Sequence, residues 1–515
     1  MRIPLTIGDF LERAALIYGD RTAIVDEPDV AGSLGRITYG ELHDRARALA
    51  VGLDEMGLAT GDRVAIVSPN SVRFLASYFG VSGFGRVLVP INFRLTADEI
   101  GYIVEHSGAS VVLYDPEFEE GTSAIGGVRR IRLDGVEDAA LFDPEVGRRS
   151  DPDGWSPDED ATCSINYTSG TTARPKGVQL THRNCWLNAV TFGWHTGVSD
   201  RDVLLHTLPM FHANGWGMPY AVTGAGGGHV VQRKIDGEVI LQRIEDEGVS
   251  LLCAAPAVVA SILAASETRQ AEGRALPGHD VRVVVAGAPP PSKTIERVER
   301  ELGWEFIQIY GLTETSPLLT LNRAPAEWDG LEAEERAQRL SRAGVPAIGV
   351  RMEVNEDGEV LARSNHVFEG YWKQPDETAK ALDGGWFHTG DGGYLDGAYT
   401  VISDRKKDVI ITGGENVSSI EVEDVLYQHE AVAEVAVIGV PDEKWGEKVL
   451  ALVVLRPGTE ASEQDLIEHC RARIAHFKAP RTVEIRQVLA RTATGKLQKY
   501  KLREPYWEGR DRAVN

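Results

Sequence analysis

The chain has 515 residues, more than a single hydrophobic core usually holds, so two or more domains are expected. Hydrophobic residues make up 43% and charged residues 25%, as in a globular protein rather than a disordered one. The formal net charge of −23 at pH 7 argues against a nucleic-acid partner and against an anionic membrane surface.

The cysteines and the N-terminus indicate a reducing, aqueous setting. The chain has no C-x-x-C pair, and its four cysteines are widely scattered, at Cys163, Cys185, Cys253 and Cys470. Neither a disulfide framework nor a zinc site is therefore expected. Residues 1–19 include Asp9 and Glu12, which does not fit a signal peptide, and no long uncharged apolar run favours stable membrane insertion. We expect a cytoplasmic protein.

Strand and helix patterns alternate along the first part of the chain. Apolar residues recur at helical spacing in 40–56 and 71–85, and short β-rich runs occupy 63–67, 86–90 and 110–114. This alternation predicts an α/β fold with a largely parallel sheet. The glycine cluster at 224–228 lacks the G-x-G-x-x-G order of a dinucleotide site, so we interpret it as a turn.

The pattern changes after residue 350. Strands are expected at 282–288 and 305–310, and the charged stretch 327–342 is expected to be a solvated helix and loop. Alternation around Asn355-Glu356-Asp357-Gly358 predicts a hairpin and a smaller β-rich subdomain. A charged patch, 404–408, precedes a further α/β segment. We predict two domains, residues 1–404 and residues 405–515.

The first motif with chemical content is YTSGTTARPKG at residues 167–177. Ser/Thr hydroxyls and the backbone N–H groups of a glycine turn form a donor surface suited to phosphate oxygens. Lys176 adds a positive charge. The spacing is not that of a G-x-x-x-x-G-K-[S/T] loop, and an exposed polar loop is an equal alternative for this motif alone.

The second and third motifs place aromatic, hydroxyl and carboxylate groups after predicted strands. In YGLTETSP (310–317), Tyr310 could stack on a flat ring, and Glu314 beside Thr313 would suit a Mg²⁺ ion held mainly by phosphates and water. In GWFHTGD (385–391), Asp391 could accept hydrogen bonds from a vicinal diol. Taken singly, Glu314 is better explained as a capping or salt-bridge residue and Asp391 as a turn residue.

The fourth and fifth motifs lie in the C-terminal part. The segment 404–423 joins a charged run to a short strand and to Gly413-Gly414, where the backbone could approach a ligand closely. In RTATGK (491–496), Lys496 follows a glycine and could reach a site elsewhere in the protein. A charge run alone is usually a solvated surface.

In this order, the five motifs resemble those of the adenylate-forming superfamily, which comprises acyl- and aryl-CoA synthetases, carrier-protein adenylation domains and firefly-type luciferases. The resemblance covers about residues 5–505. It implies a large N-terminal domain of α/β layers with a β-rich subdomain, and a small mobile α+β C-terminal domain. It also implies two steps: a carboxylic acid and ATP give acyl-AMP and pyrophosphate, and CoA then displaces AMP.

The resemblance assigns most of the site residues. A phosphate cradle would comprise Thr168, Ser169, Gly170, Thr171, Thr172 and Lys176. Mg²⁺ would be held by Glu314 and Thr171, and the α-phosphate would be contacted by Thr313. Adenosine would be bound by Gly287, Ala288, Pro289, Tyr310, Gly311, Asp391 and Arg405. Lys496 would be the adenylation lysine, Lys407 the hinge, and the CoA channel would include Gly413, Gly414 and Glu415. The catalytic groups would be Lys176, Thr313, Glu314 and Lys496.

Two positions depart from the family pattern. Ala173 stands where glycine is usual, and a residue with positive φ there would cost about 1 kcal/mol as alanine. Asp404 stands where many relatives have glycine. Neither change removes a catalytic group.

The acid pocket is expected around PMFHANGWGM (209–218). His212 stands where amino-acid-activating relatives carry an aspartate for the substrate ammonium, which disfavours amino acids. The order of residues is similar to bacterial fatty acyl-CoA synthetases, in whose long-chain members a tryptophan like Trp216 gates the acyl tunnel. The pocket would comprise His212, Gly215, Trp216, Gly311 and Leu312, and glycines at 215, 217, 287 and 311 would leave room for an apolar chain.

The leading hypothesis is an acyl-CoA ligase for a medium- or long-chain fatty acid. Alternatives are a ligase for a cinnamate-type aryl acid or a methylthioalkanoate, an acyl-AMP ligase that loads a carrier protein, and a catalytically silent binding protein. The expected small molecules are ATP, Mg²⁺, CoA and a carboxylic acid, with no nucleic acid. A homodimer is compatible with the resemblance.

Overall fold

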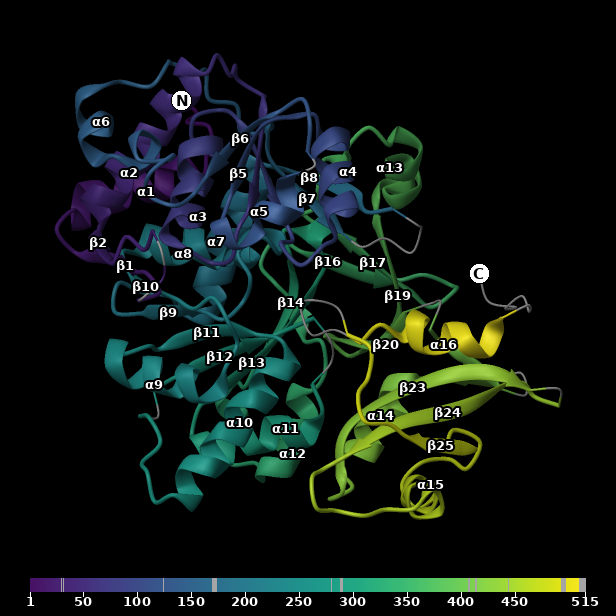
Figure 1. Cartoon of the computed structure of the whole chain (residues 1–515). Coiled ribbons are helices and arrows are strands. Elements are labelled where there is room, and N and C mark those ends of the chain that lie inside the picture. Colours follow the sequence, from purple (N-terminus) through teal and green to yellow (C-terminus); the bar gives the residue numbers. More distant parts are fainter. Residues whose placement is uncertain are drawn as a thin grey trace.

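The computed structural model describes residues 1–28, 30, 32–123, 125–168, 174–278, 280–287, 290–405, 408–412, 415–442, 444–491 and 497–508. Within these residues the strands form four sheets. No helix in the described part of the chain is long and apolar enough to cross a membrane. Figure 1 shows a large body, with the last sheet and its helices forming a smaller lobe beside it.

One sheet of the large body carries the predicted phosphate motif. Its strands, in spatial order, are β18 (Gly370–Tyr371), β8 (Lys176–Thr181), β7 (Thr162–Thr168), β4 (Val87–Ile91), β3 (Arg63–Val67), β5 (Ala109–Tyr114) and β6 (Arg129–Arg132). The strands from β7 to β6 are parallel, whereas β8 pairs antiparallel with both β7 and β18. The predicted strands at 63–67, 86–90 and 110–114 are confirmed to within one residue at each end.

The second large sheet carries the predicted adenosine residues. Its order is β15 (Val345–Pro346), β14 (Leu318–Arg323), β13 (Glu305–Gly311), β12 (Arg282–Val285), β11 (Leu251–Ala254), β9 (Val203–His206), β10 (Gly228–Val231), β1 (Thr22–Val25) and β2 (Arg36–Thr38). Because β12 and β13 are adjacent and parallel, their carboxyl ends open at the same edge of the sheet.

Helices cover these sheets, and among the described residues of the large body the buried apolar side chains form three clusters. They are α1 (Gly8–Tyr18), α2 (Tyr39–Glu55), α3 (Val72–Ser77), α4 (Ala97–Ser107), α5 (Glu119–Ser123), α6 (Pro144–Arg149), α7 (His182–Thr196), α8 (Met218–Ala225), α9 (Gly237–Glu247), α10 (Pro256–Ala271), α11 (Ser292–Arg297), α12 (Ala333–Leu340) and α13 (Pro375–Ala381). Helices α2 and α7 begin at capping boxes formed by Thr38 with Glu41 and by Thr181 with Asn184, which satisfy N–H groups of the first turn. Helix α12 lies in the stretch predicted to be solvated, but its apolar side, with Ala337 and Leu340, is buried.

The predicted β-rich subdomain and a separate C-terminal core are both present. The hairpin around Asn355–Gly358 joins β16 (Arg351–Val354) to β17 (Glu359–Arg363), and β19 (Phe387–Asp396) and β20 (Tyr399–Arg405) complete that sheet. The small lobe contains β21 (Ile410–Thr412), β22 (Glu415–Val417), β23 (Val432–Asp442), β24 (Gly446–Leu455), β25 (Thr482–Ile485), α14 (Ser419–Tyr427), α15 (Glu463–Arg471) and α16 (Lys499–Trp507). A cluster of buried apolar residues between Ile410 and Val483 forms its own core.

Candidate active site

The described ends of the phosphate motif lie in the antiparallel pair of β7 and β8. Thr168, at the end of β7, is the Cα partner of Lys176, at the start of β8, so these two predicted phosphate ligands face each other. The Lys176 ammonium forms a 2.6 Å ion pair with Glu377 of α13. Hydrogen bonds from Lys176, and next from Lys380, lower the pKa of Glu377 to about 2. An anionic group therefore already faces the lysine predicted to bind phosphate.

Tyr371, an aromatic residue that the motifs did not predict, links Glu314 with Lys176 of β8. Glu314 is in the 3-10 turn Thr313–Thr315 that follows β13, and its Oε1 accepts a 2.9 Å hydrogen bond from the Tyr371 hydroxyl. The Lys176 ammonium lies 5.0 Å from the centroid of the Tyr371 ring. Burial, and next the nearby Glu314 carboxylate, raise the pKa of Tyr371, so its hydroxyl stays a donor at neutral pH.

The donor chemistry around Glu314 fits Mg²⁺ bound mainly through a ligand. No group of three or more His, Cys, Asp or Glu side chains forms a metal cage in the described ranges. A single carboxylate beside the Thr313 hydroxyl is a donor set that Mg²⁺ accepts when phosphates and waters complete its octahedron. Thr171, the other predicted metal ligand, lies outside the described residues. Glu314 would therefore hold the ion only together with the triphosphate.

Three of the predicted adenosine residues, Tyr310, Asp391 and Arg405, lie together. The Tyr310 hydroxyl donates a 2.7 Å hydrogen bond to Asp391 Oδ2, although the two residues are 81 positions apart. Asp391 is only 8% exposed, and it is the cross-strand partner of Arg405 in the β19–β20 pair. Gly287 follows β12 with φ of +97°, in the region that favours glycine. One aromatic residue, one carboxylate and one arginine position thus meet at one place.

The predicted acid segment is a tightly bonded turn. Ala213, Asn214 and Trp216 have positive φ angles of 44°, 52° and 63°, although none is glycine. Asn214 donates a 2.9 Å hydrogen bond to Ser164 and accepts a 3.1 Å bond from Asn166, both of β7. Buried side-chain bonds of this kind offset the cost of the unfavourable backbone.

Further bonds fix the two ends of this segment. Asn70 accepts a 2.7 Å bond from the Met210 N–H and donates to the carbonyl of Leu208 at 3.1 Å. Asn188 of α7 donates a 3.1 Å bond to the Trp216 carbonyl. Trp216 is 4% exposed and belongs to the main core, whereas His212 is half-buried. The segment is therefore a rigid wall.

The glycines of this region pack against the protein itself. A Cβ atom at Gly215 would lie 2.9 Å from Pro219, one at Gly217 would overlap the Asn188 amide, and one at Gly311 would overlap the Pro317 carbonyl. These three glycines are required for close backbone and side-chain approach. They therefore give no evidence of room for a long acyl chain, which differs from the interpretation based on the sequence.

Several predicted residues lie outside the described part of the chain, so their placement remains a prediction. They are Ser169, Gly170, Thr171, Thr172, Ala288, Pro289, Lys407, Gly413, Gly414 and Lys496, together with Ala173. Of the predicted CoA channel, Glu415 is described: it is exposed at the start of β22 and pairs with Thr412. Leu312, of the predicted acid pocket, is partly buried against the main core.

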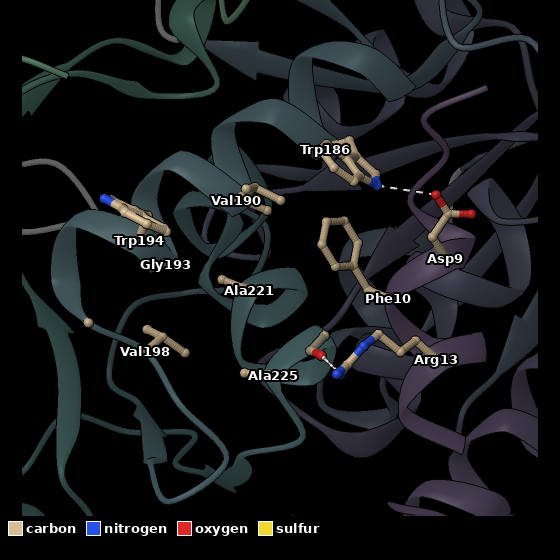
Figure 2. A pocket seen from close by; sticks show the side chains of 13 residues that line it. Asp9, Phe10, Arg13, Trp186, Val190, Gly193, Trp194, Val198, Ala221 and Ala225 are labelled. Atoms are coloured by element: carbon tan, nitrogen blue, oxygen red, sulfur yellow. Dashed lines mark hydrogen bonds between the residues drawn. The ribbon is translucent and has the colours of Figure 1, made fainter. Parts of the chain in front are cut away.

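A surface groove of about 630 Å³ lies elsewhere, between α1, α7 and α8. Figure 2 shows Phe10, Val190, Ala221 and Ala225 along it, with Trp194 at one side. None of the predicted site residues lines this groove. It is therefore separate from the candidate active site.

Comparison with known proteins agrees with this geometry. Residues 11–372 match the model of the AMP-binding enzyme family, and residues 421–496 match that of the AMP-binding enzyme C-terminal domain. The chain belongs to the AMP-binding enzyme family. The predicted superfamily, the α/β fold class and the assignment as an AMP-forming acid–thiol ligase are thereby confirmed, and ATP and CoA are substrates of this family.

Similar proteins extend over nearly the whole chain. A 2-methylpropanoate–CoA ligase, CCL4, of Humulus lupulus is 37% identical, over 97% of this chain and 95% of its own length. A 4-hydroxybutyrate–CoA ligase of Metallosphaera sedula is 36% identical, over 96% and 93%. The structure of the anthranilate CoA ligase AuaEII with anthranoyl-AMP superposes with a TM-score of 0.86, at 26% identity, covering 98% of this chain and 99% of that one.

Proposed function

We propose that this AMP-binding enzyme is an ATP-dependent CoA ligase for a short-chain aliphatic acid. The observation that carries the proposal is the packing of Gly215, Gly217 and Gly311 against protein atoms beside the buried Trp216. The expectation of a medium- or long-chain acid combined the residue order of this segment with the interpretation of those glycines as open space. The two curated relatives that act on 2-methylpropanoate and 4-hydroxybutyrate also support a short acid.

In the first step an oxygen of the acid carboxylate attacks the α-phosphorus of ATP. The new O–P bond forms as the bond to pyrophosphate breaks, giving acyl-AMP. Lys176 would neutralise charge on the β- and γ-phosphates, Thr313 would donate to the α-phosphate, and Lys496 would bridge the two reacting groups. Mg²⁺ at Glu314 and Thr171 would supply further charge neutralisation when bound with the triphosphate. Asp391 and Arg405 would hold the ribose, and Tyr310 would stack on adenine.

In the second step the CoA thiol loses its proton to solvent, its sulfur bonds to the acyl carbon, and the bond from that carbon to the AMP oxygen breaks, which releases AMP. We propose the domain division at residues 404 and 405, with a swing near Lys407 that exchanges Lys496 for the channel of Gly413, Gly414 and Glu415. One pocket cannot present both a phosphate-binding lysine and a thiol channel to the same carbonyl. The separate core of the small lobe supports this division.

The discriminating experiment is a CoA-dependent AMP-release assay across acids of increasing size. We expect the highest kcat/KM for acids of about the size of 2-methylpropanoate and 4-hydroxybutyrate, with lower values for decanoate and hexadecanoate. A maximum at hexadecanoate would restore the long-chain hypothesis. Activity on anthranilate or cinnamate would favour the aryl alternative, for which the superposition on AuaEII is the supporting observation.

Trp216→Ala tests whether the wall limits the acid. We expect this variant to shift the preference toward longer acids, and Trp194→Ala, at a 74% exposed tryptophan of α7, is the matched control. An unchanged acid profile in Trp216→Ala would reduce Trp216 to a core residue.

Lys496→Ala should stop pyrophosphate release but leave thioester formation from supplied acyl-AMP largely intact.

Two further parts of the proposal concern partners and location. AMP release without CoA, followed by acyl transfer to a carrier protein, would favour the carrier-loading alternative. The four cysteines are free thiols, which supports the proposal that the protein is cytoplasmic, in a reducing compartment.

A homodimer is compatible with the resemblance, and light scattering would test for one.

A further inference from the structure

Tyr371 lies between two charged groups that the motifs placed in the active site. Its hydroxyl donates a 2.9 Å hydrogen bond to Glu314, and the Lys176 ammonium lies over its ring, 5.0 Å from the centroid. Glu314 follows β13 of one sheet, whereas Lys176 begins β8 of the other. A single side chain thus links the predicted metal carboxylate with the predicted phosphate lysine.

The backbone holds Tyr371 firmly in this place. Strand β18 adds Tyr371 to the edge of the sheet opposite Val178. The Tyr371 N–H donates a 2.9 Å bond to the hydroxyl of Thr378 in α13, and the ring packs edge-on against Phe368 at 4.8 Å between centroids. Because backbone, ring and hydroxyl are all bonded or packed, Tyr371 can fix the positions of the groups that it touches.

We propose that Tyr371 is a positioning residue for the triphosphate site: its hydroxyl orients the Glu314 carboxylate and its ring orients the Lys176 ammonium. The inference deepens the proposed function and rests on it. Glu377, 2.6 Å from Lys176, holds the ammonium over the ring until phosphate oxygens replace the carboxylate. The tyrosine contacts make both partners ready for Mg·ATP without a large rearrangement.

The two contacts of Tyr371 predict different effects. A hydrogen bond to a carboxylate is among the stronger protein hydrogen bonds, so losing it should weaken the Mg²⁺-dependent binding of ATP, which uses Glu314. The cation–π contact is weaker at a half-exposed site and should affect phosphate binding with or without metal. The hydroxyl and the ring can therefore be separated by two substitutions.

The test compares Tyr371→Phe and Tyr371→Leu with wild type, using Tyr394→Phe, a 55% exposed tyrosine of β19, as the control. Binding of ATP is measured by calorimetry with Mg²⁺ and with a chelator, and thermal unfolding is recorded for each variant. For Tyr371→Phe we expect about tenfold weaker binding of Mg·ATP, a higher half-saturating Mg²⁺ concentration, and less than twofold change without metal. Tyr371→Leu should weaken both.

Each outcome decides the matter. Unchanged Mg·ATP binding in Tyr371→Phe overturns this inference but not the proposed function. An equal loss with and without Mg²⁺, together with a lower melting temperature, also overturns it, because that result indicates general destabilisation. Failure of the wild type to bind ATP overturns the proposed function and this inference together. A Glu314→Gln background in which Tyr371→Phe has no further effect supports the inference, because the two changes then remove one shared interaction.

Discussion

The two walls of the candidate active site are held by different forces. The acid wall, around Trp216, is fixed by neutral hydrogen bonds from buried amides such as Asn188 and Asn214. The phosphate wall is fixed by charged groups at half-buried positions, where Lys176 is paired with Glu377 and Glu314 with Tyr371. When a buried neutral hydrogen bond is lost, water does not replace the missing partner, whereas solvent-accessible charges exchange one partner for another readily.

This difference fits the role that we propose for each wall. A wall that selects an acid by size must keep its shape, because discrimination of a methylene group is worth only about 1–3 kcal/mol. A wall that binds and releases a polyanion must exchange one anion for another at low cost. Substitutions in the acid wall should therefore affect stability, and substitutions in the phosphate wall should affect ligand binding.

Gly311→Ala should have the largest effect, because Gly311 packs directly against the backbone of Pro317. The added Cβ would overlap the Pro317 carbonyl, so the backbone between β13 and β14 must shift. We expect a loss of about 3 kcal/mol or more in the free energy of unfolding, measured with urea. Gly330→Ala, where a Cβ meets no atom within 4 Å, should change it by about 0.5 kcal/mol or less. Equal stability of the two variants would contradict this explanation.

Asn188→Leu should be next, at about 2–4 kcal/mol, because two buried backbone groups lose their partner. Asn188 donates to the Trp216 carbonyl and accepts from the Leu318 N–H, both at 3.1 Å. The measurement is urea unfolding together with the acid profile of AMP release. Asn365→Leu, at an exposed asparagine, is the control. A stable Asn188→Leu variant with an unaltered acid profile would show that the wall does not need this amide.

The strand leading into the acid wall should make stability depend on pH. Buried His206 and His229 are joined by a 3.0 Å hydrogen bond, and Thr223 lies 3.1 Å from His229. Burial lowers the pKa of His206 to about 3, and burial followed by the charge of His206 lowers that of His229. Because the folded values lie below the unfolded value of about 6.5, this contribution is complete above that pH and is lost as pH falls toward the folded values.

Between pH 6.5 and 5 we therefore expect a loss of about 1.6 kcal/mol from His206, and a further loss in the same direction from His229. The double variant His206→Gln/His229→Gln should show a shallower pH dependence of unfolding than wild type. His476→Gln, at an exposed histidine, should keep the wild-type slope. An equally steep decline in the double variant would assign the effect to other groups.

Glu377→Gln should have the smallest effect, and on binding rather than on stability. Glu377 is 39% exposed, so its ion pair with Lys176 is worth about 0.5 kcal/mol after solvent screening. Removing the competing carboxylate should tighten metal-free ATP binding about twofold at low salt, with the difference vanishing at high salt. Asp376→Asn on the same helix is the control. Weaker binding in Glu377→Gln would mean that the carboxylate supports the bound state instead.

The local elements and the catalytic motifs could be predicted from the sequence. Periodicity located β3, β5, β13 and the hairpin of β16 and β17, because alternation and turn residues act over a few positions. The order of the motifs was enough to identify the superfamily. The structure brings Tyr310 and Asp391 into contact, and their roles toward adenosine stay a prediction from the resemblance.

Other features could not be predicted, because they depend on atoms brought together from distant positions. The glycines at 215, 217 and 311 were interpreted as open space, whereas in the fold they accommodate Pro219, Asn188 and Pro317. A glycine has the same local signature whether its missing Cβ is replaced by a ligand or by another part of the protein. Only the tertiary packing distinguishes the two cases.

The sequence by itself determined the α/β class and the superfamily, since both follow from local pattern and from the order of the motifs. The tertiary structure decided which groups meet. It placed Tyr371 against Glu314 and Glu377 against Lys176. These contacts depend on the pairing of β18 with β8, which joins residues almost two hundred positions apart, and no short-range periodicity encodes such a pairing.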